Sequence, residues 1–412
     1  MLLRLSASNE CDACSVLGNI VFALVLIRED GGGSFASSSQ HNLFAAMPSL
    51  RVIQREIAKL PQGPPLVIVI SGGTTGIGSY IAKELARLFA SKGSKLRVYI
   101  VGRNITRAEK VLAEGRYLSP GSEWRFVKAT DLALISEVDR CCADIIKQET
   151  DAPFHGGPVR LDALYMTHAR SPLVNREMTE EGLDSFLSTL YYSRIRMTMN
   201  LIPLLSASPL NGHVISVYAG SFEEVKAGDE PPIGCPPDDA YGVSTVRRNT
   251  VYMKNFAFEE LASRHAGRVS FAHIYPGLVD GPAFTDPGNP LWFRVIWRLL
   301  YPLLWLTYMT SAEDCGKVML YLSTPRFPAK GVKQEGIEPA MGTDGKLGSG
   351  SYALGQRADP SKVRSFDKVR PEGVGERIWA HTMETFERIV RKNKPQGSET
   401  EIQAGSWETE IS

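Results

Sequence analysis

The sequence lacks the features that would mark several specialised classes of protein. Its 46 basic and 45 acidic residues leave a formal net charge of +1, and no block of Lys or Arg is present, so we expect no nucleic-acid partner. The six cysteines include one Cys-x-x-Cys pair, Cys11 and Cys14, without a second half. This spacing predicts no metal site and is typical of reduced intracellular thiols.

The amino-terminal 46 residues are not expected to form part of the fold. Residues 14–27 are apolar at all but two positions, which is short for a bilayer span but long enough for the core of a signal peptide. Their amino-terminal flank carries Glu10 and Asp12, which is unusual for a signal. A cleaved signal or anchor and a disordered or mis-assigned extension both stay open. We expect a cytoplasmic protein and leave membrane association open.

The chain is organised around residues 66–86. The apolar run 66–71 predicts a strand buried on both faces, and apolar residues recur at helical spacing farther along. Gly72, Gly76 and Gly78 lie between the two. They predict a strand-to-helix turn whose backbone amides can approach a phosphate. The alternative is a glycine-rich turn in an α/β protein that binds no nucleotide.

The second predicted strand, 95–101, ends in Gly102, Arg103 and Asn104. Enzymes that use NAD usually place an acidic side chain here, where it accepts a hydrogen bond from the ribose, whereas a 2′-phosphate needs a cation. The guanidinium of Arg103 suits a phosphate. The sequence therefore predicts NADP(H) rather than NAD(H), and the alternative is a solvated loop arginine.

Three residues separate Gly72 from Gly76, and one residue separates Gly76 from Gly78. This spacing resembles that of the short-chain dehydrogenase/reductase superfamily. The resemblance implies an α/β protein with a Rossmann-like, doubly wound parallel sheet. We divide the chain into an extension (1–46) that is disordered or targeting, one Rossmann-like domain (47–392) and a disordered tail (393–412). The resemblance assigns cofactor contacts to the turn, to the ends of the second, third and fourth strands and to a Pro-Gly turn after the sixth: Gly72, Thr74, Thr75, Gly76, Ile77, Gly78, Arg103, Asn104, Asp131, Leu132, Thr167, Pro276, Gly277 and Val279.

Three short segments resemble one branch of this superfamily in particular. Tyr191 to Arg194, Cys315 with Gly316, and Trp379 to Thr382 resemble a fungal branch often met in secondary-metabolite gene clusters. In the superfamily a long helix, here 183–205, lines a subunit interface, which implies a homo-oligomer. The apolar pattern predicts further strands at 124–129, 161–166, 212–217 and 269–275, a surface excursion at 335–375 and a terminal helix at 376–390.

The catalytic half departs from the superfamily. Its Tyr-x-x-x-Lys motif retains Tyr241, but Thr245 stands in place of the lysine. Ala219 stands where the superfamily has the serine that holds the substrate carbonyl, and Leu190 stands in place of its proton-relay asparagine. A free phenol has a pKa of about 10, and the full gap to neutral pH is worth about 4 kcal/mol, or roughly a thousandfold in rate.

Tyr241 nevertheless remains the candidate catalytic residue. His168 follows the fourth predicted strand and could act as an acid or base, although a loop histidine is more often a structural hydrogen-bonding group. Two cations could replace the missing lysine, and three further hydroxyls could polarise a substrate oxygen. These candidates are Arg247, Arg248, Tyr218, Ser216 and Ser221.

The resemblance implies an oxidoreductase that moves hydride to or from a small lipophilic carbonyl or alcohol. Because three of the four catalytic positions are changed, a catalytically degenerate cofactor-binding scaffold or regulator is the main alternative. A non-redox lyase or isomerase that uses the same pocket is a third interpretation.

Residues 290–308 form the most apolar segment after the Pro-Gly turn. They hold three of the six tryptophans, and Pro302 predicts a break into two short helices. Arg294 and Arg298 argue against a membrane span of this length. Three fates stay open: core burial, a lid over a lipophilic substrate, and peripheral contact with a membrane. Under the last two, Trp292 and Trp297 are expected to face the ligand or the lipid.

Overall fold

The computed structural model describes residues 47–170, 176–218, 230–359 and 370–393. Within them, seven strands form one parallel sheet in the order β3-β2-β1-β4-β5-β6-β7. The strands are β1 (Leu66–Ser71), β2 (Leu96–Gly102), β3 (Glu123–Lys128), β4 (Ala163–Met166), β5 (Gly212–Val217), β6 (Val269–Ile274) and β7 (Ser351–Leu354). The predicted doubly wound α/β fold is confirmed.

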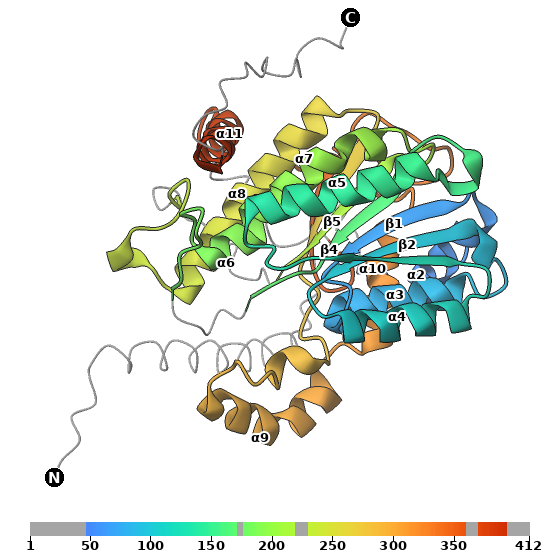
Figure 1. The fold of residues 1–412 in the computed structure, drawn as a ribbon, viewed down its shortest axis with the longest axis horizontal. Helices are drawn as coiled ribbons and strands as arrows, with labels where there is room; N and C mark the ends of the chain where they lie inside the picture. Colours follow the sequence, from blue (N-terminus) through green and yellow to red (C-terminus); the bar gives the residue numbers. More distant parts are fainter. Residues whose placement is uncertain (1–46, 171–175, 219–229, 360–369, 394–412) are drawn as a thin grey trace, which may run out of the picture.

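Helices cover both faces of the sheet (Figure 1). They are α2 (Leu50–Ile57), α3 (Gly76–Leu88), α4 (Ile105–Leu118), α5 (Ile135–Asp151), α6 (Ser185–Leu187), α7 (Ser193–Ser206), α8 (Val243–Arg264), α9 (Leu291–Thr307), α10 (Ala312–Tyr321) and α11 (Val374–Asn393). One hydrophobic core lies between the sheet and α2, α3, α4 and α10, and the other lies between the sheet and α5, α7, α8 and α11. Because both faces are covered, β1, β2, β5 and β6 are buried along their whole length, as their apolar sequences predict.

The strand order reverses beside β1. The chain runs outward from β1 to β2 and β3, then returns, so that β4 pairs with the opposite edge of β1 and Ser71 lies in register with Met166. In open α/β sheets, ligands bind outside the carboxyl ends of the strands at such a switch point. The glycine turn follows β1 at this point.

The predicted helix 183–205 is interrupted. The chain forms α6, then a π-helical turn over Ser188–Tyr192, then α7. A π turn holds more residues than an α turn, so it rotates the residues that follow. Ser193 and Arg194 come directly after it, and both are fully buried.

Two predictions about the carboxy-terminal part are wrong. The excursion 335–375 contains β7, which pairs with β6; this strand was missed because its four residues lie between Gly350 and Gly355, which read as turn signals. Pro302 does not split 290–308, because α9 continues through it. Trp297 and Leu304 lie on either side of Pro302, seven residues apart and therefore on one helical face, and both are buried. Their burial holds both halves of the helix on the same surface.

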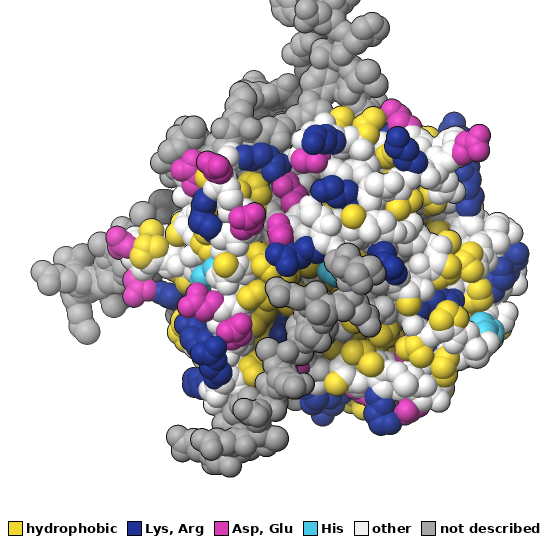
Figure 2. All heavy atoms as spheres, turned by 90° about the horizontal axis from the view of Figure 1, so that it is seen from above, with side chains coloured by type: hydrophobic (Ala, Val, Ile, Leu, Met, Phe, Trp, Pro, Cys, Tyr) yellow, Lys and Arg dark blue, Asp and Glu magenta, His cyan; other side chains and the backbone are white. Residues whose placement is uncertain are grey.

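The described part of the chain ends near the predicted boundaries. The extension 1–46 and the tail 394–412 lie outside the described residues, so the domain division stays a prediction. Figure 2 shows Lys and Arg side chains interspersed with Asp and Glu side chains over the face seen from above. No helix among the described residues is long and apolar enough to span a membrane.

Candidate active site

The glycine turn after β1 leaves no room for side chains at two of its glycines. A Cβ at Gly72 would lie 2.5 Å from the backbone nitrogen of His168, and Gly72 has a φ of 81°. A Cβ at Gly78 would lie 2.4 Å from the carbonyl oxygen of Gly72. These contacts pack the turn against the end of β4, and they explain why glycine is needed at both positions.

The start of α3 has no side-chain cap and has open space beside its first residue. The helix begins at Gly76, and its N-cap Thr75 makes no side-chain capping bond. Gly76 has a φ of 56°, and nothing lies within 4 Å of the position that a Cβ would take. The first amides of a helix favour an anion. The turn therefore fits the pyrophosphate of a dinucleotide, with Thr74 and Ile77 beside it in sequence.

The end of β2 packs against this turn. A Cβ at Gly102 would lie 2.4 Å from Cγ2 of Thr74, so glycine is needed here as well. Asn104 caps α4, since its Oδ1 accepts a hydrogen bond of 2.9 Å from the amide of Arg107. The Arg103 side chain is exposed and makes no hydrogen bond or ion pair with the described residues. Among the residues predicted at this strand end, Arg103 is therefore the one available to a ligand.

Two further predicted contacts follow β3 and β4. Asp131 accepts a bond of 2.9 Å from the amide of Ala133, and its other carboxylate oxygen lies 2.5 Å from the guanidinium of Arg170. Leu132 is buried beside it. The Oγ1 of Thr167 donates to the carbonyl oxygens of Ser71 and Gly72, at 3.0 and 3.2 Å. The structure therefore brings Thr167 directly to the turn, while Asp131 already has a basic partner.

The predicted Pro-Gly turn follows β6. Gly277 has a φ of 77°, and a Cβ there would lie 2.5 Å from the side chain of Gln356. Val279 is buried and forms an isolated bridge with Thr310. Pro276 is the residue that leads into this turn. Because β6 is parallel to β1 in the same sheet, this turn lies at the same edge as the glycine turn.

Tyr241 lies before α8 rather than within it. Its hydroxyl donates a hydrogen bond of 2.8 Å to the carboxylate of Asp184, the N-cap residue of α6. The Arg176 guanidinium lies 4.7 Å from the centre of its ring. Burial and the Asp184 carboxylate raise the pKa of the Tyr241 phenol. The phenol that the sequence indicates is therefore held by an acceptor that disfavours its ionised form.

A buried polar cluster fills the space beside the ends of β4, β5 and β6. His168 lies between two hydroxyls, with Nδ1 2.8 Å from Ser71 Oγ and Nε2 3.2 Å from Ser193 Oγ. Burial and the nearby charge of Arg194 lower the pKa of His168 well below its usual value. His168 is therefore a neutral structural group, which favours the second of the two interpretations given for it.

Arg194 connects this cluster to two strand ends. Its guanidinium donates to the carbonyl oxygens of His168 and Val217, each at 2.6 Å, and to Ser216 Oγ at 2.8 Å. Burial lowers the pKa of Arg194 to about 9. Sequence reasoning did not assign Arg194 a role in the site, although the run Tyr191 to Arg194 was singled out. A charged residue that follows an apolar helical stretch was the available signal.

Known fungal proteins resemble this chain along most of its length. No family model matches the chain. A short-chain dehydrogenase/reductase of Stachybotrys chartarum is 55% identical over 356 residues, which cover 84% of this chain and 99% of that protein. The chain belongs to the short-chain dehydrogenase/reductase family. An oxidoreductase of Emericella variicolor is 34% identical over 85% of this chain and 100% of that protein. A solved L-sorbose reductase of Gluconobacter frateurii, complexed with NADPH and L-sorbose, aligns with a TM-score of 0.45 and 18% identity over 64% of this chain and 91% of that chain.

The segments that resemble a fungal branch of the short-chain dehydrogenase/reductase family lie at contacts between helices. Tyr191 and Tyr192 in the π turn bond to Thr382 and His381 of α11, at 2.7 and 2.8 Å. A Cβ at Gly316 would lie 2.5 Å from the side chain of Glu84, so this glycine lets α10 approach α3. These segments therefore hold the outer helices to the family's sheet.

The changed positions of the family's catalytic tetrad are only partly described. Thr245 lies half-buried in the first turn of α8, and Leu190 is buried in the π turn. Ala219 and Ser221 lie outside the described residues. Tyr218 follows β5 and is buried. The tetrad positions that the structure describes thus hold Leu190, Tyr241 and Thr245.

Proposed function

We propose that this protein is an NADP(H)-dependent oxidoreductase that moves hydride to or from a small lipophilic carbonyl or alcohol. Membership of the short-chain dehydrogenase/reductase family supports the reaction class. The observation that carries the cofactor preference is Arg103, an exposed guanidinium without a described partner at the end of β2. We also place the reaction in secondary-metabolite biosynthesis, because of the three branch segments.

The residues at the turn fit a dinucleotide. The first amides of α3 would hold the pyrophosphate, Arg103 would hold the 2′-phosphate, and the turn from Pro276 to Val279 would hold the carboxamide. Asp131 would approach the adenine only on the side that Arg170 leaves open. When bound, NADPH supplies the hydride; the protein orients the two partners and polarises the substrate oxygen.

Cofactor titration by nicotinamide fluorescence tests this proposal. We expect NADPH to bind at least tenfold more tightly than NADH. Arg103→Ala should weaken NADPH binding by about 2 kcal/mol, the usual size of a hydrogen bond to a charged group, and should leave NADH binding unchanged. Lys110→Ala, which removes another exposed cation on α4, is the matched control. Equal affinity of the native protein for both cofactors would contradict the preference.

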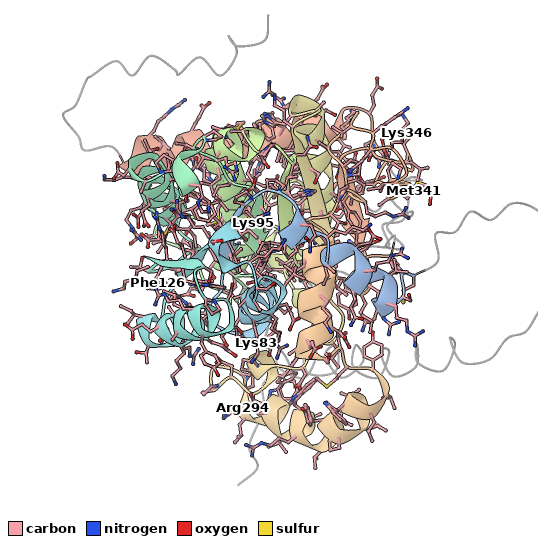
Figure 3. All side chains as sticks on the ribbon, turned by 90° about the vertical axis from the view of Figure 1, so that its right-hand side faces the viewer. Lys83, Lys95, Phe126, Arg294, Met341 and Lys346 are labelled. Atoms are coloured by element: carbon pink, nitrogen blue, oxygen red, sulfur yellow. The ribbon has the colours of Figure 1, made fainter. Side chains whose placement is uncertain are left out.

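The segment 290–308 supports a lipophilic substrate. It forms α9, which stands below the body of the molecule in Figure 1 and again, with Arg294 marked on it, in Figure 3. Only Phe293, Trp297 and Leu304 are buried, so simple core burial is excluded. The exposed large apolar side chains of α9 are Leu291, Trp292, Val295, Leu299, Leu303, Trp305 and Leu306.

Residues just before and just after α9 hold this helix near α3, which follows the glycine turn. Val279 and Thr310 form a bridge that joins its two ends. The Asp280 backbone oxygen accepts from Tyr80 on α3 at 2.9 Å, and its carboxylate accepts from Tyr301 on α9 at 3.2 Å. An apolar helix held next to the start of α3 is suited to cover a lipophilic substrate. We also propose that its exposed face contacts a membrane surface, where aromatic and basic side chains are favoured.

Vesicle sedimentation tests the membrane contact. Leu299, at 76% exposed, is the most exposed large apolar residue of α9, so Leu299→Glu should release the protein from vesicles that contain anionic lipid. Leu347→Glu places the same charge at an exposed leucine outside α9 and should have no effect. If neither the native protein nor the variants sediment, α9 does not contact membranes, and the substrate role is then judged by the affinity for decanal.

The alternative, a cofactor-binding scaffold without activity, is favoured by one observation. Tyr241 donates to Asp184 and has a raised pKa, so it is poorly placed as the family's acid/base group. The scaffold interpretation predicts tight NADPH binding without oxidation of NADPH in the presence of any lipophilic carbonyl. Turnover with decanal would exclude it.

A further inference from the structure

Because Thr245 stands in place of the family's lysine, the sequence does not decide which tyrosine acts as the acid and base at this site. Tyr241 and Tyr218 are both candidates in sequence. The Tyr241 hydroxyl has a partner, because it donates to the Asp184 carboxylate at 2.8 Å. The Tyr218 hydroxyl is buried and no described group meets it at hydrogen-bonding geometry, although the Arg247 guanidinium lies near enough to lower the pKa of the phenol. A buried polar atom without a partner costs about 1–3 kcal/mol, so a partner is expected in the working protein.

The backbone places Tyr218 at the active edge of the sheet. It is the residue directly after β5, and its amide donates to the carbonyl oxygen of Ile274 at the end of β6, at 3.0 Å. Arg194 holds the preceding carbonyl, that of Val217, at 2.6 Å. Arg194 also holds the carbonyl of His168, whose amide packs against the glycine turn. One guanidinium therefore links the backbone before Tyr218 to the phosphate-binding turn.

The ring of Tyr218 is surrounded by three side chains of the core. It stacks on the ring of His273, with the two centres 6.2 Å apart and the planes 13° apart. The Lys254 Nζ lies 5.1 Å from the ring centre and is itself buried without a described hydrogen-bond partner. Phe186 meets the ring edge at 6.5 Å between centres. These contacts leave little freedom to the ring and so fix where the hydroxyl points.

We propose that Tyr218, rather than Tyr241, exchanges the proton with the substrate oxygen. This proposal rests on the proposed oxidoreductase function. In reduction, the carbonyl carbon gains the hydride supplied by NADPH while the O–H bond of Tyr218 breaks, its proton forms the new O–H bond of the alcohol, and its electron pair stays on the phenolate. Water then returns a proton to the phenolate. In oxidation the same bonds would form and break in reverse, with the hydride leaving the alcohol carbon for bound NADP⁺.

The charged groups around Tyr218 act against the effect of its burial, although the pKa of its phenol stays raised, as that of Tyr241 does. Burial raises the pKa of its phenol, whereas the positive charges of Arg247 on α8 and Arg194 on α7 lower it. Two other titratable groups contact its ring, Lys254 on α8 and His273 on β6, and His168 lies in the same buried cluster, near Arg194 and Lys254. Burial and the neighbouring cations lower the pKa of all three, which favours their neutral forms. Arg247 thus lies where it can do part of the work of the lysine that Thr245 replaces.

Three matched tyrosine variants test the assignment, with NADPH and decanal as probes. Tyr218→Phe should lower kcat by about a hundredfold or more, the usual size of general acid catalysis, and should leave the Kd for NADPH unchanged. Tyr241→Phe should lower kcat less than threefold. Tyr191→Phe removes another fully buried hydroxyl of the same core, one that bonds to Thr382, and is the control for lost stability.

The pH profile of kcat separates this role from a structural one. Arg247→Met removes a positive charge, which should raise the pKa of the Tyr218 phenol. The limb of the kcat profile that reports this phenol should therefore move to higher pH. Arg247→Lys keeps the charge and should restore the limb. Arg248→Met, the neighbouring cation, should leave it in place.

Decanol binding to the NADPH complex provides a second measurement if turnover is slow. Tyr218→Phe should weaken it about tenfold, because the hydroxyl hydrogen bond is lost. Equal kcat and equal decanol affinity for Tyr218→Phe and the native protein would overturn the assignment of Tyr218 while NADPH binding stands. Absence of NADPH binding would overturn the proposed function itself.

Discussion

The two sides of the sheet's carboxyl edge present different chemistry. Beside β1 and β2, the available groups are backbone amides at the start of α3 and the exposed guanidinium of Arg103. Beside β4, β5 and β6, the ionisable groups are buried, with Arg194 and Lys254 fully enclosed. The first side can bind an anion from solvent with little rearrangement of the protein. The second side keeps its ionisable groups in a low-dielectric interior, where each hydrogen bond and each pKa depends strongly on the neighbouring groups.

The largest expected effect is a loss of stability when a buried tryptophan of α9 is removed. Trp297 is buried and stacks on Phe284 with their ring centres 4.0 Å apart, whereas Trp292 is 39% exposed. The expectation that both tryptophans face a ligand is therefore wrong for Trp297. Trp297→Ala should lower the free energy of unfolding by about 4 kcal/mol, and Trp292→Ala by less than about 1 kcal/mol. Urea denaturation measures both, and similar losses would contradict the division of α9 into a buried and an exposed face.

Acid sensitivity should also arise at the amino-terminal end of β5, away from the carboxyl edge, where His213 is buried. Burial lowers the pKa of His213, whose Nδ1 lies 2.8 Å from Ser270 Oγ, to about 4. As the pH falls below about 6.5, the unfolded chain takes up a proton on this histidine, whereas the native protein does not until about pH 4. The native protein should therefore lose about 3 kcal/mol across this window. His213→Gln should reduce that loss, and the exposed His155→Gln should not.

The glycine turn should tolerate change unequally. Gly78→Ala would place its Cβ 2.4 Å from the Gly72 carbonyl oxygen, so we expect a loss of about 2 kcal/mol in stability, typical of overpacking. Gly76→Ala meets open space and is strained only by its positive φ, at about 1 kcal/mol. Thermal unfolding of the two variants compares them. A larger loss in Gly76→Ala would show that backbone strain, rather than the close approach of Gly78 to the Gly72 carbonyl, governs the turn.

The smallest effect is expected from Thr245→Lys. Tyr241 lies outside α8 and is bonded to Asp184, so a lysine four residues later does not recreate the family's catalytic pair. Catalytic groups that act as a unit are not restored by one replacement. Decanal reduction should therefore change less than tenfold. A hundredfold gain would show that the lysine was the sole deficit and would argue against Tyr218.

The cofactor side could be predicted from the sequence because its geometry depends on local residues. The strand 66–71, the three glycines and Gly102 with Arg103 lie close together in the chain, and their backbone conformations follow from residue type. The structure agrees with these segments, although it shows that Asn104 caps a helix and that Asp131 pairs with Arg170. Binding of NADP(H) by the whole set stays a prediction for titration to test.

The rest was decided by contacts between distant segments. By itself the sequence determined the alternation of strands and helices, the doubly wound fold class and the family, because the apolar periodicity and the glycine spacing carry this information. Only the tertiary structure placed Arg194 after a π turn and brought Lys254 and His273 to the ring of Tyr218. It also showed that the Tyr241 hydroxyl donates a hydrogen bond to Asp184. Partner choice and burial of these groups depend on residues tens of positions away, and no local pattern encodes such desolvation.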